Sequence, residues 1–226
     1  MKILIVAATK FEIASFTDAL GIPQALSKHL SRYETNHHQF DVLITGIGMV
    51  FTTYHLSTVL AIEKYDYALN VGVAGAIDKT IVLGEIVHVE QDYFYELGAE
   101  DAENWLDVHD LGLLTKNDLP YKANGLNNNN LPKLSAIEQL KQVKGQTVNK
   151  VHGNLQSIKT MQIRSKAQVE SMEGAAFLYC CMQHQLPCAQ IRAISNYVEL
   201  RNKNNWKMQL AIQQLNDFLK SSYLNS

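Results

Sequence analysis

The chain contains 226 residues, carries a formal net charge of -2, and is 46% apolar and 19% charged. A chain this long and this apolar can bury a sizeable core, which excludes intrinsic disorder, and its balanced charge excludes a polyanion such as nucleic acid as an expected partner. Because soluble domains usually carry about 25% charged residues, we expect the surface either to use neutral polar residues, as in NGLNNNN and NKNNW, or to be partly covered by another copy of the chain.

Short apolar runs rich in Val and Ile alternate with longer segments of helical period, a pattern typical of strands that helices bury on both faces. The expected strands are residues 2–8, 40–45, 67–73, 85–91, 146–152 and 188–194. The expected helices are residues 10–20, 50–63, 133–143, 172–184 and 204–219. The sequence therefore predicts an α/β sandwich.

Residues 107–132 are the segment most typical of a loop, because two prolines, a glycine and four consecutive asparagines lie close together there. Strand and helix patterns resume after it in the same style, and no internal repeat is visible. We therefore expect an excursion within one domain that spans residues 1–226, not a linker between two domains.

Nothing in the sequence points to a membrane, a secretion signal or a metal. The longest apolar runs, residues 3–8 and 175–182, are shorter than the roughly 18–20 residues that cross a bilayer, and the N-terminus lacks a signal-peptide cleavage site. The three cysteines show no disulfide or zinc spacing, and the eight histidines show no metal-ligand spacing. We expect a cytoplasmic protein without a metal.

Four short motifs follow expected strands and a fifth opens a helix, where ligands bind in open α/β sheets. They are AATKFE at 7–12, TGIGMV at 45–50, NVGVAGAI at 70–77, ESMEGAA at 170–176 and RAISN at 192–196. Gly48 and Gly72 lie in two of these motifs. A glycine there either closes a tight, closely packed turn or lets a ligand approach backbone N–H donors.

Two carboxylates in these motifs could divide the work of a hydrolytic site. Glu12 lies in the first turn after the first strand and Glu173 opens a helix, so either one alone could simply cap a helix or face solvent. Together at one crevice, one could accept a proton from water while the other binds sugar hydroxyls.

Asn196 and Arg192 belong to the last expected strand and its end. Asn196 either fills a turn or recognises a planar ring through its carboxamide, which offers one acceptor and two donors in a single plane. Arg192 would need an acidic partner if it is buried, and Glu12 is the candidate.

The order and spacing of the five motifs resemble those of the purine nucleoside phosphorylase and nucleosidase superfamily, particularly its hydrolytic branch, over nearly the whole chain. The segments ESMEGAAFLY and IRAISNYVELRNKNNW look most like the futalosine hydrolases, which release hypoxanthine from futalosine in a route to menaquinone. The resemblance implies a three-layer α/β/α sandwich with a central mixed, largely parallel sheet, a homo-oligomer, and no metal or organic cofactor.

The resemblance also implies a role for each matching residue. Glu12 matches the acid that activates the attacking water, with Arg192 nearby. Met172 and Glu173 match the residues that hold the ribose, and Asn196 matches the residue that meets the purine. The implied partner is a small nucleoside, and the implied reaction is hydrolysis of the N-glycosidic bond of futalosine.

Three departures from related patterns refine this expectation. Adenine-releasing relatives carry Asp where this chain has Asn196, whose amide can donate to a 6-oxo group and accept from a ring N–H, which favours a 6-oxopurine. Phosphorylases grip phosphate with an arginine where this chain has Asn70, so water is the expected nucleophile, although Lys10 offers a cation in the first loop. Val73 replaces the Ser that is usual in nucleosidases.

Arg201 and Trp206 follow Asn196 in a polar stretch. They could bind the benzoate that futalosine carries on its ribose side chain, or they could simply pack the last helix. Three alternatives to a futalosine hydrolase remain: a 5′-methylthioadenosine/S-adenosylhomocysteine-type nucleosidase, a phosphate-dependent 6-oxopurine nucleoside phosphorylase, and a purine-nucleoside-binding module without a competent base.

Overall fold

The computed structural model describes residues 1–115, 118, 120–122 and 125–224, so five residues of the expected loop 107–132 lie outside the described residues. The strands are β1 Lys2–Ala7, β2 Gln24–Ala25, β3 Leu30–Glu34, β4 Gln39–Ile44, β5 Tyr67–Ala76, β6 Ile86–Asp92, β7 Gly98–Asp101, β8 Asn104–Asp107, β9 Leu126–Asn127, β10 Lys141–Thr147, β11 Val169–Ser171 and β12 Cys188–Tyr197. The helices are α1 Lys10–Leu20, α2 Met49–Ile62, α3 Ser135–Glu138, α4 Leu155–Arg164, α5 Gly174–Gln183 and α6 Met208–Tyr223, with a 3-10 turn at Lys203–Asn205. None of the helices in the described part of the chain has the length and apolar character that crossing a bilayer requires.

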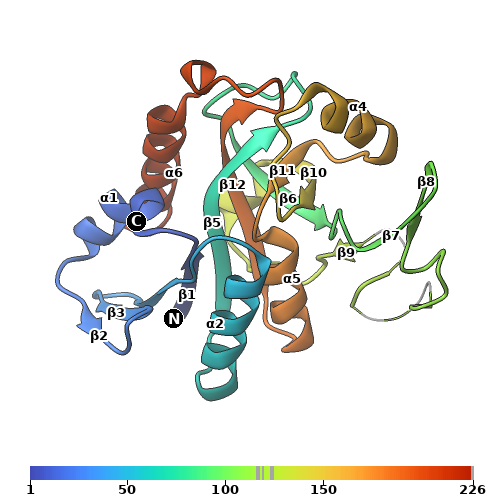
Figure 1. The fold of residues 1–226 in the computed structure, drawn as a ribbon. Helices are drawn as coiled ribbons and strands as arrows, with labels where there is room; N and C mark the ends of the chain where they lie inside the picture. The colour runs from blue at the N-terminus through green and yellow to red at the C-terminus, as the bar shows by residue number, and fades with distance from the viewer. Residues whose placement is uncertain (116–117, 119, 123–124, 225–226) are drawn as a thin grey trace.

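All strands except the hairpin β7–β8 form one mixed sheet, which lies between two pairs of helices (Figure 1). The sheet order is β11–β10–β6–β12–β5–β1–β4–β3–β2, and the central run β12–β5–β1–β4 is parallel throughout. Helices α1 and α6 pack on one face, and α2 and α5 pack on the other. This arrangement confirms the expected three-layer α/β/α sandwich with a central mixed, largely parallel sheet.

Strand β1 shows why such residues form a buried central strand. Ile3, Ile5 and Ala7 belong to the core that α1 and α6 share, whereas Leu4 and Val6 belong to the core that α2 and α5 share. Successive side chains of a strand point to opposite faces, so a strand covered by helices on both sides needs a continuous apolar run. Each fully buried Leu, Ile or Val side chain contributes about 1.5–3 kcal/mol.

Strands β5 and β12 run further than expected, and the added residues build one end of the sheet. β5 continues to Ala76 because its last residues pair with both β12 and β11. β12 continues to Tyr197 through an irregularity of register between Ile194 and Asn196, which sets Asn196 opposite Gly75. A bulge re-aims the side chain that follows it, so the end of β12 is shaped to present Asn196.

The expected helix at 133–143 is wrong. Helix α3 covers only four residues there, and β10 begins at Lys141, five residues before the strand expected at 146–152. The apolar spacing of Leu134 and Ile137 suggested a longer helix, but these side chains pack a short turn against the core beneath α1 and α6. Pairing of the following residues with β6 then takes precedence over local helical periodicity.

Smaller differences lie elsewhere along the chain. Helix α4 was not expected, and its N-cap is Asn154, whose side chain accepts the backbone N–H groups of Gln156 and Ser157. Helix α6 begins at Met208, four residues later than expected, after the 3-10 turn. Between β6 and β9 the chain forms the hairpin β7–β8, which projects from the body of the molecule at the right of Figure 1.

Candidate active site

A cavity of about 300 Å³ lies at the carboxyl ends of β1, β5, β11 and β12. Its walls include five of the residues expected from the sequence: Glu12, Met172, Glu173, Asn196 and Trp206. Contacts of this wall with Gly48, Gly72 and Arg192 bring in three more, and Arg201 lines an adjoining hollow. The fold therefore gathers the expected residues from separate segments of the chain into one place.

Glu12 both caps a helix and faces the cavity. Thr9, the N-cap of α1, donates to Glu12 Oε2 from its N–H at 2.9 Å and from its hydroxyl at 3.0 Å. The N–H of Val73 donates to the other oxygen, Oε1, at 3.3 Å. A carboxylate can accept about four hydrogen bonds, so Glu12 is fixed in the wall while it keeps capacity for a water.

Arg192 is fully buried beside Glu12, but the two do not form the ion pair that the sequence suggested. The guanidinium donates to Gln190 Oε1 at 3.0 Å and to Asn70 Oδ1. Within the described residues no carboxylate lies at ion-pair distance from it, so the expectation of Glu12 as its direct partner is wrong. Burial lowers the pKa of Arg192, and the fields of three nearby carboxylates, that of Glu173 foremost, oppose this shift.

Gly72 is explained by the side chains that crowd against it. A Cβ at this position would lie 2.6 Å from Arg192 Nη1 and 2.8 Å from Glu12 Oε1, which is too close for either atom to stay in place. The glycine in NVGVAGAI therefore serves close packing, one of the two roles that the sequence left open. A direct part in substrate binding stays a prediction.

Glu173 reaches the cavity wall from the start of α5. Its Oε1 accepts the backbone N–H of Gly48 at 2.9 Å. Gly48 has a φ of 98°, a conformation that favours glycine, and this conformation turns its N–H toward the carboxylate. Glu173 is 7% exposed, and burial raises its pKa while the positive charge of Arg192 opposes the rise.

Asn196 makes two local hydrogen bonds, and its carboxamide can form two more. Its Oδ1 accepts the hydroxyl of Ser195 at 2.8 Å, and its Nδ2 donates to the carbonyl of Tyr197 at 3.0 Å. A carboxamide has two N–H groups and two lone pairs, so one of each remains for a ligand. Gly75 leaves room for this amide, because a Cβ there would lie 3.2 Å from Nδ2.

Arg201 and Trp206 lie next to Asn196. Both line the hollow that adjoins the cavity, and the Arg201 guanidinium lies 5.0 Å from the centre of the Trp206 ring. The N–H of Arg201 donates to the carbonyl of Gly153 at 3.0 Å, which ties this loop to the start of α4. Their expected contact with a substrate tail stays a prediction.

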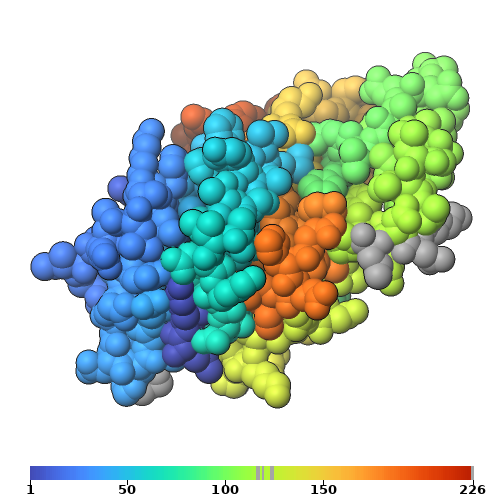
Figure 2. Space-filling model, turned by 90° about the horizontal axis from the view of Figure 1, so that it is seen from below, coloured from blue at the N-terminus to red at the C-terminus, as the bar shows by residue number. Residues whose placement is uncertain are grey.

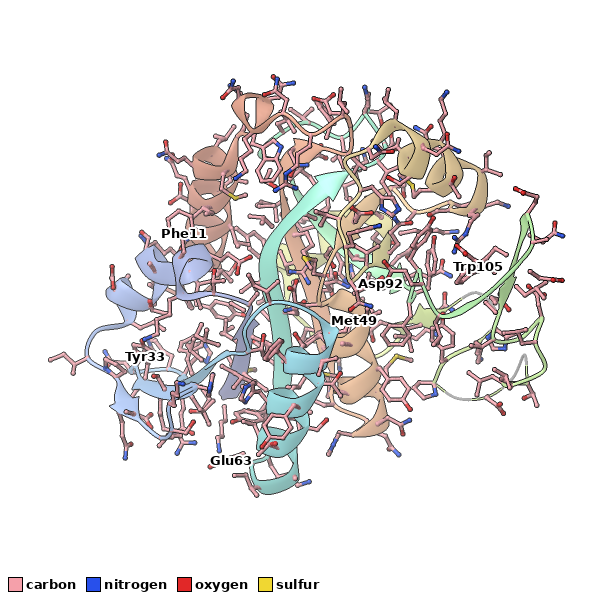
Figure 3. The ribbon with its side chains drawn as sticks, viewed as in Figure 1. Phe11, Tyr33, Met49, Glu63, Asp92 and Trp105 are labelled. Carbon is pink, nitrogen blue, oxygen red and sulfur yellow. The ribbon has the colours of Figure 1, made fainter. Side chains whose placement is uncertain are left out.

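Nothing in the sequence pointed to Asp92, a fully buried carboxylate at the end of β6 (Figure 3). Gln190 Nε2 donates to its Oδ2 at 2.9 Å, and the Thr147 hydroxyl donates to its Oδ1 at 3.0 Å. Burial raises the pKa of Asp92 to about 6. A Cβ at Gly174 would lie 2.4 Å from Oδ2, so the glycine of ESMEG lets α5 begin against this group.

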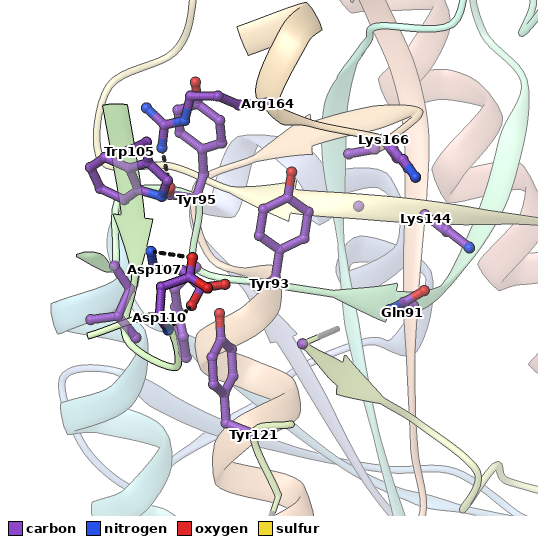
Figure 4. Close-up of a pocket in the computed structure, with 15 residues that line it drawn as sticks. Gln91, Tyr93, Tyr95, Trp105, Asp107, Asp110, Tyr121, Lys144, Arg164 and Lys166 are labelled. Atoms are coloured by element: carbon purple, nitrogen blue, oxygen red, sulfur yellow. Dashed lines mark hydrogen bonds between the residues drawn. The ribbon is translucent and has the colours of Figure 1, made fainter. Parts of the chain in front are cut away.

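A second hollow, of about 360 Å³, lies between β6, β10 and the β7–β8 hairpin (Figure 4). The Arg164 guanidinium lies 4.4 Å from the ring of Tyr95 and 3.8 Å from that of Trp105. None of the expected site residues lines this hollow, so its larger volume does not make it the active site. In the described ranges, no group of three or more His, Cys, Asp or Glu could hold a metal ion.

No protein-family model matches the chain. Futalosine hydrolase of Thermus thermophilus is 31% identical over 179 residues, which cover 78% of this chain and 77% of that protein. The 5′-methylthioadenosine/S-adenosylhomocysteine nucleosidase of Colwellia psychrerythraea is 26% identical over 87% of this chain and 84% of that protein. The structure of futalosine hydrolase from Helicobacter pylori has a TM-score of 0.81 at 18% identity and covers 100% of this chain and 98% of its own, which shows the fold.

The alignment with the Thermus protein covers most of both chains, and 31% identity over that length shows common descent. The fold is also that of the Helicobacter protein. These findings confirm the resemblance that the order of the motifs indicated. The chain therefore belongs to the nucleosidase family that includes futalosine hydrolase, whose members are hydrolases acting on N-glycosyl bonds.

Proposed function

We propose that this protein hydrolyses the N-glycosidic bond of futalosine and releases hypoxanthine and dehypoxanthine futalosine, a step in a route to menaquinone. The observation that carries the proposal is the convergence of Glu12, Glu173 and Asn196 on one cavity. Together they supply a base for water, an anchor for the ribose and an amide for the purine. The 31% identity to a futalosine hydrolase supports futalosine as the substrate.

The reaction passes through an oxocarbenium-like state, by analogy with glycosidases that place two carboxylates around the scissile bond. The C–N bond breaks and its electron pair goes to the purine, which leaves as an anion that the amide of Asn196 stabilises and that then takes a proton from solvent to give hypoxanthine. Water attacks the anomeric carbon as Glu12 accepts its proton, while Glu173 accepts hydrogen bonds from the ribose hydroxyls. The buried charge of Arg192 counters the rise that burial imposes on the pKa of Glu173, which favours the carboxylate form.

Water rather than phosphate is the nucleophile that the site supports. None of the described residues that line the cavity is a lysine or an arginine, so a phosphate there would lack a cation in contact. Asn70 is buried, and it bonds Arg192 and the carbonyl of Val6 instead of facing the cavity. Lys10 is exposed and does not line the cavity.

Release of the free base from three nucleosides, with and without phosphate, tests this function. We expect hypoxanthine release from futalosine without phosphate, at a kcat/KM above that for inosine and for 5′-methylthioadenosine. Adenine release from 5′-methylthioadenosine as the fastest reaction would support the nucleosidase function of the Colwellia relative instead. A requirement for phosphate would indicate a phosphorylase, and binding without release would indicate a non-catalytic module.

Arg201 and Trp206 are the residues we propose for the benzoate of futalosine. An exposed arginine beside an aromatic face suits a carboxylate on a ring, and both residues adjoin the cavity. Arg201→Ala should weaken futalosine affinity and leave inosine affinity unchanged, because inosine has no carboxylate. An unchanged affinity for futalosine would remove Arg201 from this role.

We further propose that the chain is a single domain over residues 1–226 and that it works in the cytoplasm.

We also propose that the protein forms a homo-oligomer through helix α2. Val50, Phe51 and Tyr54 on this helix are 75%, 57% and 67% exposed. Figure 2 shows α2, in cyan, lying beside α5, in orange, on one open face. A second copy of the chain would bury these apolar side chains. Phe51→Glu should lower the mass in solution to the 25.4 kDa of one chain, and a wild-type protein of that mass would contradict the proposal.

A further inference from the structure

Glu170 and His152 form a pair beside Asn196 that the proposed mechanism does not use. Glu170 lies on β11 and is 3% exposed. Its Oε1 accepts the backbone N–H of His152 at 2.9 Å, and its Oε2 contacts the ring nitrogen Nδ1 of the same residue. Gln146 Nε2 donates to Oε2 at 2.8 Å. A buried carboxylate is thus held on both oxygens at the edge of the cavity.

A chain of hydrogen bonds connects Glu170 to the second hollow through Gln146 and Tyr93. The hydroxyl of Tyr93, labelled in Figure 4, donates to Gln146 Oε1 at 3.2 Å. This bond turns the amide nitrogen of Gln146 toward Glu170. Burial raises the pKa of Tyr93 to about 12, so its hydroxyl keeps its proton and remains a donor. The same hydroxyl also contacts Ser165 Oγ, where the serine hydroxyl can be the donor, so the single Tyr93 proton can point to Gln146 and Glu170 is the acceptor at the end of this chain of hydrogen bonds.

Glu170 in turn sets the ring of His152. A carboxylate can only accept, so it selects the tautomer of His152 with the proton on Nδ1, which leaves the lone pair of the imidazole at Nε2. The ring is packed edge to face against Tyr95, with ring centres 5.0 Å apart. Among the described residues no group forms a hydrogen bond with Nε2, and this nitrogen is not sealed from solvent. It is an oriented acceptor without a partner.

The hollow lined by His152 is continuous with the cavity. The two share five wall residues, which are Gly75, Val151, Glu170, Asn196 and Trp206. Asn196 has one N–H and one lone pair left for the base, because Ser195 and the carbonyl of Tyr197 take the others. An acceptor held in one orientation beside it would add to the discrimination between bases.

We propose that His152 is a second base-recognition residue, whose Nε2 accepts the N1–H of a 6-oxopurine, and that Glu170 is its positioning residue. The inference rests on the proposed function and deepens its preference for hypoxanthine. Hypoxanthine carries a hydrogen on N1, whereas adenine carries a lone pair there, so only the 6-oxo base satisfies the ring nitrogen. Leaving this hydrogen bond unmade in the complex lowers affinity roughly tenfold to a hundredfold.

Calorimetric titration with free bases tests the inference directly. The probes are hypoxanthine, adenine and 1-methylhypoxanthine, which keeps the 6-oxo group but replaces the N1 hydrogen with a methyl group. We expect the wild-type protein to bind hypoxanthine about tenfold to a hundredfold more tightly than the methylated base. His152→Phe keeps an aromatic ring without an acceptor, and it should bring this ratio to within a few-fold of one.

Glu170→Gln separates positioning from folding. The carboxamide can donate to Nδ1, which moves the ring proton to Nε2 and turns that atom into a donor. Preference for hypoxanthine over the methylated base should then fall, even though the variant keeps its thermal stability. A merely structural role for Glu170 would change the stability and leave the ratio as it is.

His184→Phe is the matched control, because His184 is exposed at the end of α5, away from the cavity, and its loss should not change the ratio. Equal binding of both bases by the wild-type protein, or an unchanged ratio in His152→Phe, would overturn the inference. Release of hypoxanthine from futalosine by the same preparations tests the proposed function separately. An active enzyme with no effect of His152→Phe on the ratio refutes only the inference, whereas an inactive protein with the expected ratio refutes only the proposed function.

Discussion

The backbone N–H of Gly48 donates to Glu173 Oε1 at 2.9 Å and joins the start of α2 to the start of α5 across 125 residues of chain. An N–H at a helix start carries partial positive charge, which favours a carboxylate at that point. The same two helices pack together on one face of the sheet (Figure 2). The place of Glu173, the carboxylate proposed to bind the ribose, therefore depends on how the backbone turns at one glycine.

Gly48→Ala should lower both stability and activity. With φ of 98° and ψ of 165°, Gly48 occupies a region that other residues enter only at a cost of roughly 1–3 kcal/mol. Gly21 is a matched control, since it has φ of 95° and ψ of -147° and, like Gly48, open space where a Cβ would stand. We expect a similar loss of thermal stability in both alanine variants and a raised KM for the nucleoside only in Gly48→Ala. Identical kinetics in the two variants would show that the bond to Glu173 does not matter.

Glu12→Gln should lower kcat by about two to four decades while KM changes only a few-fold, because general-base help is worth about that much. Thr9→Ala is the control: it removes a hydroxyl that bonds the same carboxylate oxygen and leaves the carboxylate in place. That variant should lose about 0.5–2 kcal/mol of stability with little change in kcat. Initial rates of base release measure both. Turnover of Glu12→Gln within a few-fold of wild type would remove Glu12 from the role of base.

Asn196→Asp should reduce kcat/KM for futalosine more than for an adenine nucleoside. The new carboxylate has no N–H for the 6-oxo group, whereas it can still accept from the amino group of adenine. Ser195→Ala is a useful companion, because it removes the hydroxyl that bonds Asn196 Oδ1 and keeps the amide itself. Equal losses on both substrates in Asn196→Asp would contradict the argument for base recognition.

Strands and candidate site residues could be predicted from the sequence where the residues that define them are close together along the chain. Glu12 follows Ala7, the last residue of β1, by five positions, so the strand and the carboxylate both belong to one short segment. Glu173 could likewise be placed at the opening of a helix, and Asn196 at the end of the last strand, where the carboxyl ends of the strands meet at one edge of the sheet.

Hydrogen bonds between residues that are distant along the chain could not be predicted from a local sequence pattern. Asp92 is bonded by Thr147 and Gln190, which lie 55 and 98 residues away, and neither pairing has a local pattern. Arg192 is similar, since its bond to Asn70 spans 122 residues and replaced the expected contact with Glu12. The error at 133–143 has the same origin, because pairing of β10 with β6 overrode an apolar spacing that locally favoured a helix.

Asp92 contributes less to the free energy of unfolding as the pH rises, the opposite of a carboxyl group whose pKa is lowered by folding. Burial raises its pKa from 3.8 to about 6 in the folded protein, so between about pH 4 and pH 6 the folded state holds a proton that the unfolded state has lost. The free energy of unfolding contributed by this group is therefore fully present below pH 4 and is lost as the pH rises through 6. Carboxyl groups with lowered pKa values, such as that of Asp78, contribute in the opposite direction.

Comparison with Asp92→Asn isolates the effect of this one group. Asparagine can still accept the Thr147 hydroxyl and the N–H of Tyr93, but it cannot titrate, and the bond it loses with Gln190 costs the same at every pH. Unfolding by denaturant should give a wild-type minus variant difference in free energy that falls steadily from pH 4 to pH 6 and is flat above about pH 7. A difference that is constant over this range would mean that Asp92 titrates alike in the folded and unfolded chain. A difference that rises with pH would mean that hydrogen bonds from Gln190, Thr147 and Tyr93 outweigh burial and lower its pKa.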